Sequence, residues 1–146
     1  MRIGELAKRT GCEVETVRYY EKEGLLTLPQ RDGSGYRNYS PQQLEELQFI
    51  RHCRSLGMPL TEIRALLRFR YHPQWDCAGV NAIMDTQIAR VEEQMRGLQS
   101  LLEQLHLLRK ECIARQQTKE CGIMRNLNQA AKGEPCQCHP LPEKCD

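Results

Sequence analysis

The sequence predicts a mainly α-helical protein. It would have a winged helix-turn-helix head, a pair of linker helices and a long helix that forms an antiparallel coiled coil with a second copy. Three observations lead to this fold class. Apolar residues recur at alternating spacings of four and three along residues 84–105, which is a heptad pattern. Residues 80–112 contain no proline. Near the N-terminus, two shorter apolar faces precede a cluster of turn-forming residues.

Residues 1–39 are expected to form two short helices and a hairpin. Gly11 separates two apolar faces at helical spacing, and Gly24 suits the end of the second helix. The members of these faces are Ile3, Leu6, Ala7, Val14, Val17 and Tyr20. Two helices joined by a tight, glycine-containing turn form a helix-turn-helix. The second helix also carries groups able to contact base edges and phosphates in a major groove, namely Glu15, Thr16, Arg18, Tyr19 and Lys22.

The hairpin is predicted from an Asp-Gly-Ser-Gly turn at residues 32–35 beside alternating aromatic and polar residues. Tyr36 and Arg37, with Arg31 and Tyr39, are expected to lie along a sugar-phosphate backbone as a wing. Ser40 then caps a helix that has Pro41 at its first position and Gln43 completing a capping box. A further helix is expected to end near residues 71–73.

The long helix has one apolar stripe, formed by Met84, Ile88, Val91, Met95, Leu98, Leu102 and Leu105. Continuing the register by seven places Cys112 on the same stripe. A helix from Cys77 to Cys112 would be about 50 Å long, so these two thiols cannot meet within one chain. In an antiparallel homodimer, Cys77 of one protomer would instead meet Cys112 and Cys121 of its partner. Three thiolates would then converge at each end.

Composition limits the class of protein. The net charge is +2, and residues 1–75 carry 12 basic against 9 acidic side chains, so a polyanion would bind the N-terminal half. No segment suggests a signal peptide or a membrane span, which predicts a cytoplasmic protein without a membrane partner. Eight cysteines in such a chain favour reduced thiols for metal or redox chemistry over a disulfide framework. No catalytic constellation is found, so the chain is not expected to be an enzyme.

Four runs in the first 39 residues form a recognisable set: Ile3-Gly4-Glu5-Leu6-Ala7, Glu15-Thr16-Val17-Arg18-Tyr19-Tyr20-Glu21, Gly24-Leu25-Leu26 and Tyr36-Arg37-Asn38-Tyr39. Together they resemble the DNA-binding head of the MerR family of transcription regulators, and the similarity covers about 125 residues in all. The resemblance implies a homodimer that binds double-stranded DNA at a palindromic operator. It also implies that an effector distorts the DNA, realigns promoter elements for RNA polymerase and so activates transcription. Arg18, Tyr19 and Lys22 would work in the major groove, with Tyr36 and Arg37 on phosphates.

Cys77, Cys112 and Cys121, with their neighbours, are most similar to the lead- and cadmium-responsive members of the family. Copper-sensing members typically lack a thiol at the position of Cys77, and zinc-sensing members usually carry Cys-Cys-His around the position of Cys112. Three soft thiolates suit Pb(II), Cd(II) or Hg(II), whereas structural Zn(II) prefers four ligands. We therefore expect Pb(II) or Cd(II) as the effector and a role in activating heavy-metal resistance genes. Hg(II) or Zn(II) remain alternatives.

The predicted domains are a head at residues 1–39, a connecting helix pair at 40–76, a dimerisation helix with metal-binding loop and short C-terminal helix at 77–130, and a flexible Cys/Pro-rich tail at 131–146. The tail offers an auxiliary metal site formed by Cys136, Cys138, His139 and Cys145, against the alternative of an incidental disordered end. Cys12 and Cys53 are interpreted as structural. Two rival functions use the same thiols: a redox sensor that forms disulfides, and a metal-sequestering protein.

Overall fold

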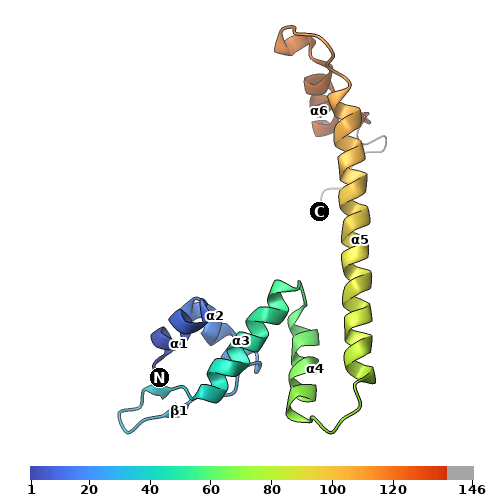
Figure 1. Cartoon of the computed structure of the whole chain (residues 1–146). Coiled ribbons are helices and arrows are strands. Elements are labelled where there is room, and N and C mark those ends of the chain that lie inside the picture. The colour runs from blue at the N-terminus through green and yellow to red at the C-terminus, as the bar shows by residue number, and fades with distance from the viewer. Residues whose placement is uncertain (138–146) are drawn as a thin grey trace. The chain divides into compact units, whose positions relative to one another are not determined.

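The computed structural model describes residues 1–137, and its contacts divide the chain into two compact units, Met1–Gln87 and Ile88 onward. The elements, in order, are α1 (Ile3–Thr10), α2 (Val14–Lys22), β1 (Gln30–Arg31), β2 (Arg37–Asn38), α3 (Pro41–Ser55), α4 (Leu60–Tyr71), α5 (Ala78–Arg109), the 3₁₀ turn η1 (Thr118–Glu120) and α6 (Gly122–Ala131) (Figure 1). The predicted fold class is confirmed: the described part is mainly helical, with a helix-turn-helix, a small hairpin and one long helix.

The turn between α1 and α2 depends on Gly11. This residue has φ 65°, a left-handed conformation that costs a glycine little, and the Cys12 amide donates to the Ala7 carbonyl at 3.0 Å. The space beside Gly11 is filled by the guanidinium of Arg51, which donates to the Thr10 carbonyl. The chain therefore turns sharply into α2, as the sequence predicted.

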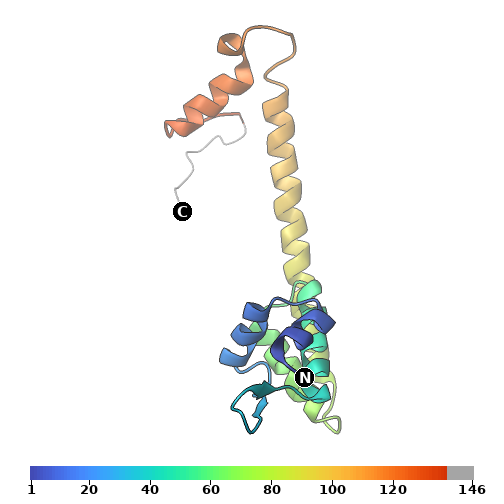
Figure 2. The ribbon, with the colours of Figure 1, turned by 90° about the vertical axis from the view of Figure 1, so that its left-hand side faces the viewer.

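The wing is a two-residue antiparallel pairing in which Gln30 faces Asn38 and Arg31 faces Arg37. Asp32 organises its turn, because one carboxylate oxygen accepts from the Ser34 and Tyr36 amides, each at 3.0 Å. Burial acts to raise the pKa of Asp32, but these two amides and the nearby Arg2 outweigh it, and the pKa is lowered. Figure 2 shows the loop between the strands projecting away from the helices.

Helix α3 begins and ends with recognisable caps. At its start the Ser40 amide donates to Gln43 Oε1 at 2.6 Å, which confirms the predicted capping box. At its end Gly57 has φ 76° and its amide donates to the Arg54 carbonyl at 2.9 Å, while the Met58 amide donates to the Cys53 carbonyl at 3.3 Å. These two bonds form a Schellman motif, which turns the chain into α4.

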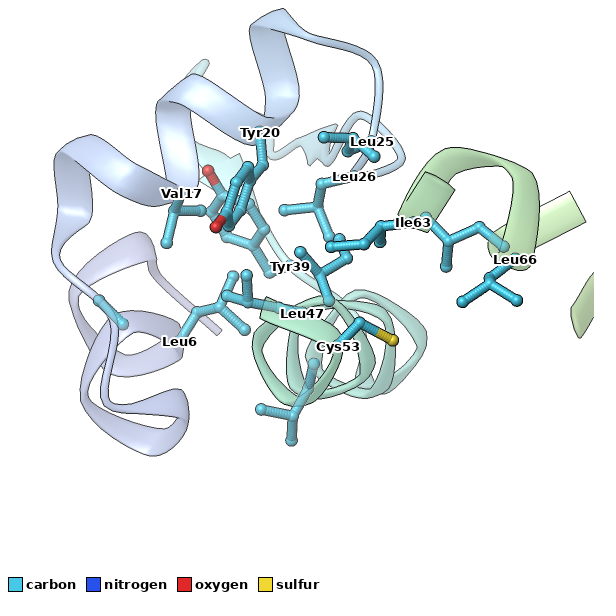
Figure 3. Close-up of a cluster of buried hydrophobic side chains, with 14 of the residues drawn as sticks. Leu6, Val17, Tyr20, Leu25, Leu26, Tyr39, Leu47, Cys53, Ile63 and Leu66 are labelled. Carbon is cyan, nitrogen blue, oxygen red and sulfur yellow. The ribbon is translucent and has the colours of Figure 1, made fainter. Parts of the chain in front are cut away.

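One hydrophobic core holds the first unit together (Figure 3). Helices α1 to α4 supply Leu6, Val17, Leu47 and Ile63, each 0% exposed, and the wing supplies Tyr39 at 2%. Burial at roughly 25 cal/mol per Å² of apolar surface makes such a cluster the main source of stability. The Tyr39 hydroxyl donates to Glu21 Oε1 at 2.5 Å, so the end of the wing is fixed to α2.

Helix α5 begins after Asp76, whose Oδ1 accepts from the Ala78 amide at 2.7 Å. Its first turns belong to the first unit, where Val80, Ile83 and Met84 pack against the core. Beyond Gln87 the apolar stripe is exposed in a single chain, and its members there are Ile88, Val91, Met95, Leu98, Leu102 and Leu105.

The register prediction for Cys112 was wrong. Helix α5 ends at Arg109, so Cys112 lies in the following turn instead of on the helical stripe. The last amides bond back to i−3 carbonyls, with Glu111 N to Leu108 O at 3.1 Å and Cys112 N to Arg109 O at 3.4 Å. This tighter winding ends the α-helix and rotates the following residues out of the heptad register. No helix in residues 1–137 is both long and apolar enough to cross a membrane.

Candidate functional site

The second unit brings Cys112 and Cys121 together. Their thiols lie close enough to shift each other's pKa, and both line a surface pocket of about 370 Å³. The Cys112 thiol donates to the Ala114 carbonyl at 3.6 Å. The other lining residues come from the end of α5 and from the loop, and they are Arg109, Ile113, Ala114, Arg115, Gln116, Thr118 and Ile123. Two thiols side by side in an open pocket can bind one soft metal ion or be oxidised together to a disulfide.

Several contacts close the loop that joins the two thiols. The Arg109 guanidinium donates to the Cys112 carbonyl at 2.6 Å, and the Cys121 amide donates to the Thr118 carbonyl at 3.1 Å. Gly122 packs directly on the Glu111 carbonyl, where a Cβ atom would overlap the oxygen. The start of α6 can therefore approach the end of α5 closely, which places residue 121 beside residue 112.

The two thiols differ in acidity. The neighbouring Cys121 thiol is the main cause that raises the pKa of Cys112 above its ordinary range. The pKa of Cys121 is lowered, first by the backbone amide of Met124 and then, against the effect of burial, by Cys112 and the amide of Ile123. These amides belong to the first turn of α6, and a helix N-terminus favours a thiolate. Cys121 is therefore the more acidic of the two thiols.

Cys77 lies in the first unit, exposed, one residue before α5. Trp75, the only tryptophan of the chain, stacks on His72 with 4.0 Å between ring centroids and meets the edge of Phe69 at 5.5 Å. Gly79 allows α5 to begin against the Phe69 ring, since a Cβ there would overlap it. This aromatic cluster fixes the short connection that carries Cys77, and no sequence pattern indicated it.

A single chain does not complete a metal site within residues 1–137, where no group of three or more His, Cys, Asp or Glu side chains is arranged to hold an ion. Cys112 and Cys121 supply two soft ligands. The donor set therefore fits a thiophilic metal if one further thiol is added. Arg109 lines the same pocket, and its positive charge would offset the negative charge of a metal bound by three thiolates.

The side chains predicted to contact DNA lie on α2 and the wing. Arg18, Tyr19, Lys22, Tyr36 and Arg37 are exposed, and Thr16 is half-buried. Arg18 pairs with Glu15 at 2.6 Å, and Arg37 lies 3.5 Å from Glu21. Sequence reasoning missed Arg2, whose guanidinium lies 4.8 Å from the centre of the Tyr36 ring and pairs with Asp32 at 2.8 Å. Arg2 thus adds a positive charge to the wing.

Of the predicted auxiliary site, only Cys136 falls among the described residues, and Cys138, His139 and Cys145 lie outside them. Cys136 is buried beside α6, where the neighbouring Gln137 amide donates to Asn126 Oδ1 at 2.9 Å. Cys53 is buried in the core and Cys12 packs at its edge, as expected of structural thiols.

Taken together, a helix-turn-helix, a wing and a long helix followed by a thiol pair indicate a DNA-binding regulator. The model of the MerR HTH family regulatory protein matches residues 1–69, and that of the MerR DNA-binding region matches residues 44–108. The transcriptional regulator ZntR of Escherichia coli K12 is 36% identical over 139 residues, which are 94% of this chain and 99% of that protein. The chain therefore belongs to the MerR family.

Two solved structures extend the comparison. The transcription regulator PbrR691 of Ralstonia metallidurans CH34, in complex with lead(II), is 46% identical, with a TM-score of 0.77 over 87% of this chain and 98% of that one. The dual-function regulator MerR of Bacillus megaterium MB1, in complex with mercury(II), is 30% identical, with a TM-score of 0.67 over 88% and 99%. The chain is therefore a transcription regulator that acts on promoter DNA, not an enzyme, and its relatives include metal-responsive members.

Proposed function

We propose that this chain is a homodimeric, metal-responsive regulator in which Pb(II) or Cd(II) binds between protomers, through Cys77 of one and Cys112 with Cys121 of the other. The single observation that supports it best is the pairing of Cys112 with Cys121 in an open pocket. Cys77 precedes α5 and Cys112 follows it, and a helix of 32 residues is about 48 Å long. If Cys77 is the third thiol, it therefore comes from the partner protomer.

A second copy is also what the exposed stripe of α5 requires. Met95 and Leu98 are 64% and 67% exposed in the single chain, and such a stripe is stable in water only when another helix covers it. Antiparallel pairing places the start of one α5 beside the end of the other. The same symmetry that buries the stripe therefore completes two metal sites.

The choice of metal follows from the donor set and the relatives. Three thiolates suit large, polarisable ions that accept one-sided or trigonal coordination, whereas Zn(II) favours four ligands. The 46% identity to a regulator solved with lead(II) supports Pb(II), and we group Cd(II) with it as a soft divalent ion. Hg(II), which is bound in the structure of a relative of 30% identity, and Zn(II) are the alternatives. A competition titration of the four ions distinguishes between them.

On DNA, Thr16, Arg18, Tyr19 and Lys22 of α2 would enter the major groove, and Tyr36 and Arg37 would contact phosphates. Metal binding would change how the two heads hold a palindromic operator, and the distorted DNA would allow RNA polymerase to transcribe heavy-metal resistance genes. We place this activity in the cytoplasm, where promoter DNA is found. The domains would be the DNA-binding head at residues 1–39, the connecting pair at 40–76, the dimerisation and sensing segment at 77–130, and the tail at 131–146.

Mixed dimers test the shared site directly. A Cys77→Ser chain and a Cys112→Ser/Cys121→Ser chain should each fail to bind Pb(II), Cd(II) or Hg(II) with high affinity alone. A randomly exchanged equal mixture should regain about a quarter of the wild-type sites, because half the dimers are mixed and each has one complete site. Thiolate-to-metal absorbance counts the sites, and Trp75 fluorescence reports binding near Cys77. If the mixture binds no more than its parents, the shared site is wrong.

The adjacency of Cys112 and Cys121 also favours a second candidate, a thiol redox sensor. Here a hydroperoxide would take two electrons and two protons from the pair, forming one disulfide and yielding an alcohol and water. Cys77 has no part in that reaction. If the protein senses metal, Cys77→Ser should abolish metal-induced transcription and leave operator affinity unchanged. If it senses redox state, the same variant should keep its transcriptional response to an oxidant.

We also propose an auxiliary metal site formed by Cys136, Cys138, His139 and Cys145. It would capture metal ions but would not be needed for the transcriptional response. Truncation after residue 134 should lower the number of weakly bound metal ions per chain and leave metal-induced transcription unchanged. Loss of the transcriptional response on truncation would assign the tail a role in the switch itself.

A further inference from the structure

Helix α3 ends in a turn that satisfies most of its own backbone groups. The amides of Gly57 and Met58 satisfy the carbonyls of Arg54 and Cys53, and Arg54 Nη1 donates to the Met58 carbonyl at 2.9 Å. The Leu56 carbonyl instead accepts from outside the turn. Its donor is Gln87 Nε2 at 2.7 Å, from a residue 31 positions later in α5.

Gln87 is placed for this contact by the same face of α5 that docks on the core. Val80, Ile83, Met84 and Gln87 are spaced as neighbours on one side of a helix, and the first three pack against the core cluster. The Gln87 side chain is only 7% exposed, whereas the next residue, Ile88, is 55% exposed. Gln87 is therefore the final docked residue of α5 in the first unit.

The hydrogen bond from Gln87 defines the rotation and position of α5 against α3 more sharply than the apolar contacts do. The hydrophobic effect has no preferred direction, so apolar packing defines the rotation of a helix less sharply than a hydrogen bond does. A hydrogen bond to the end of α3 is directional, and an N–H donor there also suits the negative end of the helix dipole. The open side of Gly57 makes room for it, since a Cβ there would lie 3.1 Å from Gln87 Nε2.

We propose that Gln87 is a positioning residue that couples metal binding at Cys77 to the DNA-binding head. The inference rests on the proposed function. Cys77 lies directly before α5, so a metal bound there would act on the start of the helix that Gln87, further along, fixes to α3. Helix α3 in turn packs on α1 and donates from Arg51 to the Thr10 carbonyl. A shift of the start of α5 would therefore move α3 and the helix-turn-helix directly. It would not have to be transmitted through the turn between α3 and α4.

The test uses full-length dimers and four variants. Gln87→Glu keeps the shape but replaces the donor by an oxygen, and Gln87→Met removes the donor without adding a charge. Gln87→Lys restores a donor. Gln94→Glu is the matched control, because Gln94 is an exposed residue of the same helix. Metal-induced transcription, operator Kd and metal Kd are measured for each, with circular dichroism to verify folding.

We expect Gln87→Glu and Gln87→Met to lower the metal-induced activation ratio about tenfold, within the usual range of coupling between sites. Their operator and metal Kd values should change by less than about twofold, Gln87→Lys should recover most of the activation, and Gln94→Glu should match the wild type. Full activation by Gln87→Met, equal impairment of Gln87→Lys, or a parallel loss of operator binding would each overturn the proposal.

Hydrogen exchange separates this inference from the proposed function. Without any metal, the amides of Gly57 and Met58 should exchange faster in Gln87→Met than in the wild type, and Gln94→Glu should leave them unchanged. Unchanged exchange in Gln87→Met overturns the positioning role even if the protein responds to metal. A wild-type protein that shows no metal-induced transcription refutes the proposed function, whatever the exchange rates are.

Discussion

Replacing the buried carboxylate of Glu46 by an amide should destabilise the first unit strongly. Glu46 is 0% exposed, and its Oε2 accepts from the Thr27 amide at 3.0 Å and the Thr27 hydroxyl at 2.9 Å. Its Oε1 accepts from Gln42 Nε2 at 3.0 Å and from the Tyr71 hydroxyl. The network links Thr27, which precedes the wing, and Tyr71, the last residue of α4, to a single side chain of α3.

The expected magnitude follows from this geometry. In Glu46→Gln one of the two oxygens becomes an NH₂ group. If it faces Thr27, the Thr27 amide, which can only donate, loses its acceptor; if it faces Gln42 and Tyr71, their side chains can turn to accept. In either orientation the four partners lose a charged acceptor. A hydrogen bond to a charged group contributes about 1.5–3 kcal/mol and a neutral one about 0.5–1.5 kcal/mol, so weakening the four bonds by about 1 kcal/mol each gives about 4 kcal/mol. That is a large part of the roughly 5–15 kcal/mol by which a domain is stable.

Urea unfolding followed by far-ultraviolet circular dichroism, at a fixed protein concentration, measures the effect. Glu45→Gln is the matched control: the Glu45 side chain is 65% exposed and its Oε2 lies 3.2 Å from Arg70 Nη2, so its loss should cost less than about 1 kcal/mol. If Glu46→Gln is no more destabilising than Glu45→Gln, the convergence of donors on Glu46 does not stabilise the fold and the reasoning fails.

Two further predictions concern the wing and α6. Burial, and then the hydrogen bond to Glu21, raise the pKa of Tyr39 above its ordinary 10.0. The stability from this group is therefore complete below pH 10 and declines as the pH rises towards the folded-state pKa. Tyr39→Phe should lower the free energy of unfolding by about 1–2 kcal/mol at neutral pH. It should also remove part of the decline in stability at alkaline pH, which unfolding measurements at several pH values follow. A pH dependence equal to that of the wild type would contradict this. Asn126→Ala should release the Gln137 amide and expose the thiol of Cys136, so a thiol reagent should modify Cys136 faster than in the wild type, while equal rates would show that Asn126 does not hold this segment.

Local signals in the sequence were enough for most of the first unit. Gly11 and Gly24, with the Ser40 capping box, fix where helices begin and end, because caps and left-handed residues act within one turn of chain. The apolar spacing also indicated which helix faces are buried. The heptad stripe identified α5, although its final residues wind more tightly than a continued heptad allows.

The sequence by itself therefore determined the order and type of the elements, the family resemblance and the set of thiols that could bind a metal. Tertiary structure alone decided that Glu46 is buried among four donors and that Gln87 closes the end of α3. Helical periodicity reports which side of an element is apolar. It does not report which polar side chain meets a carbonyl 31 residues away, because that contact depends on how separate helices pack.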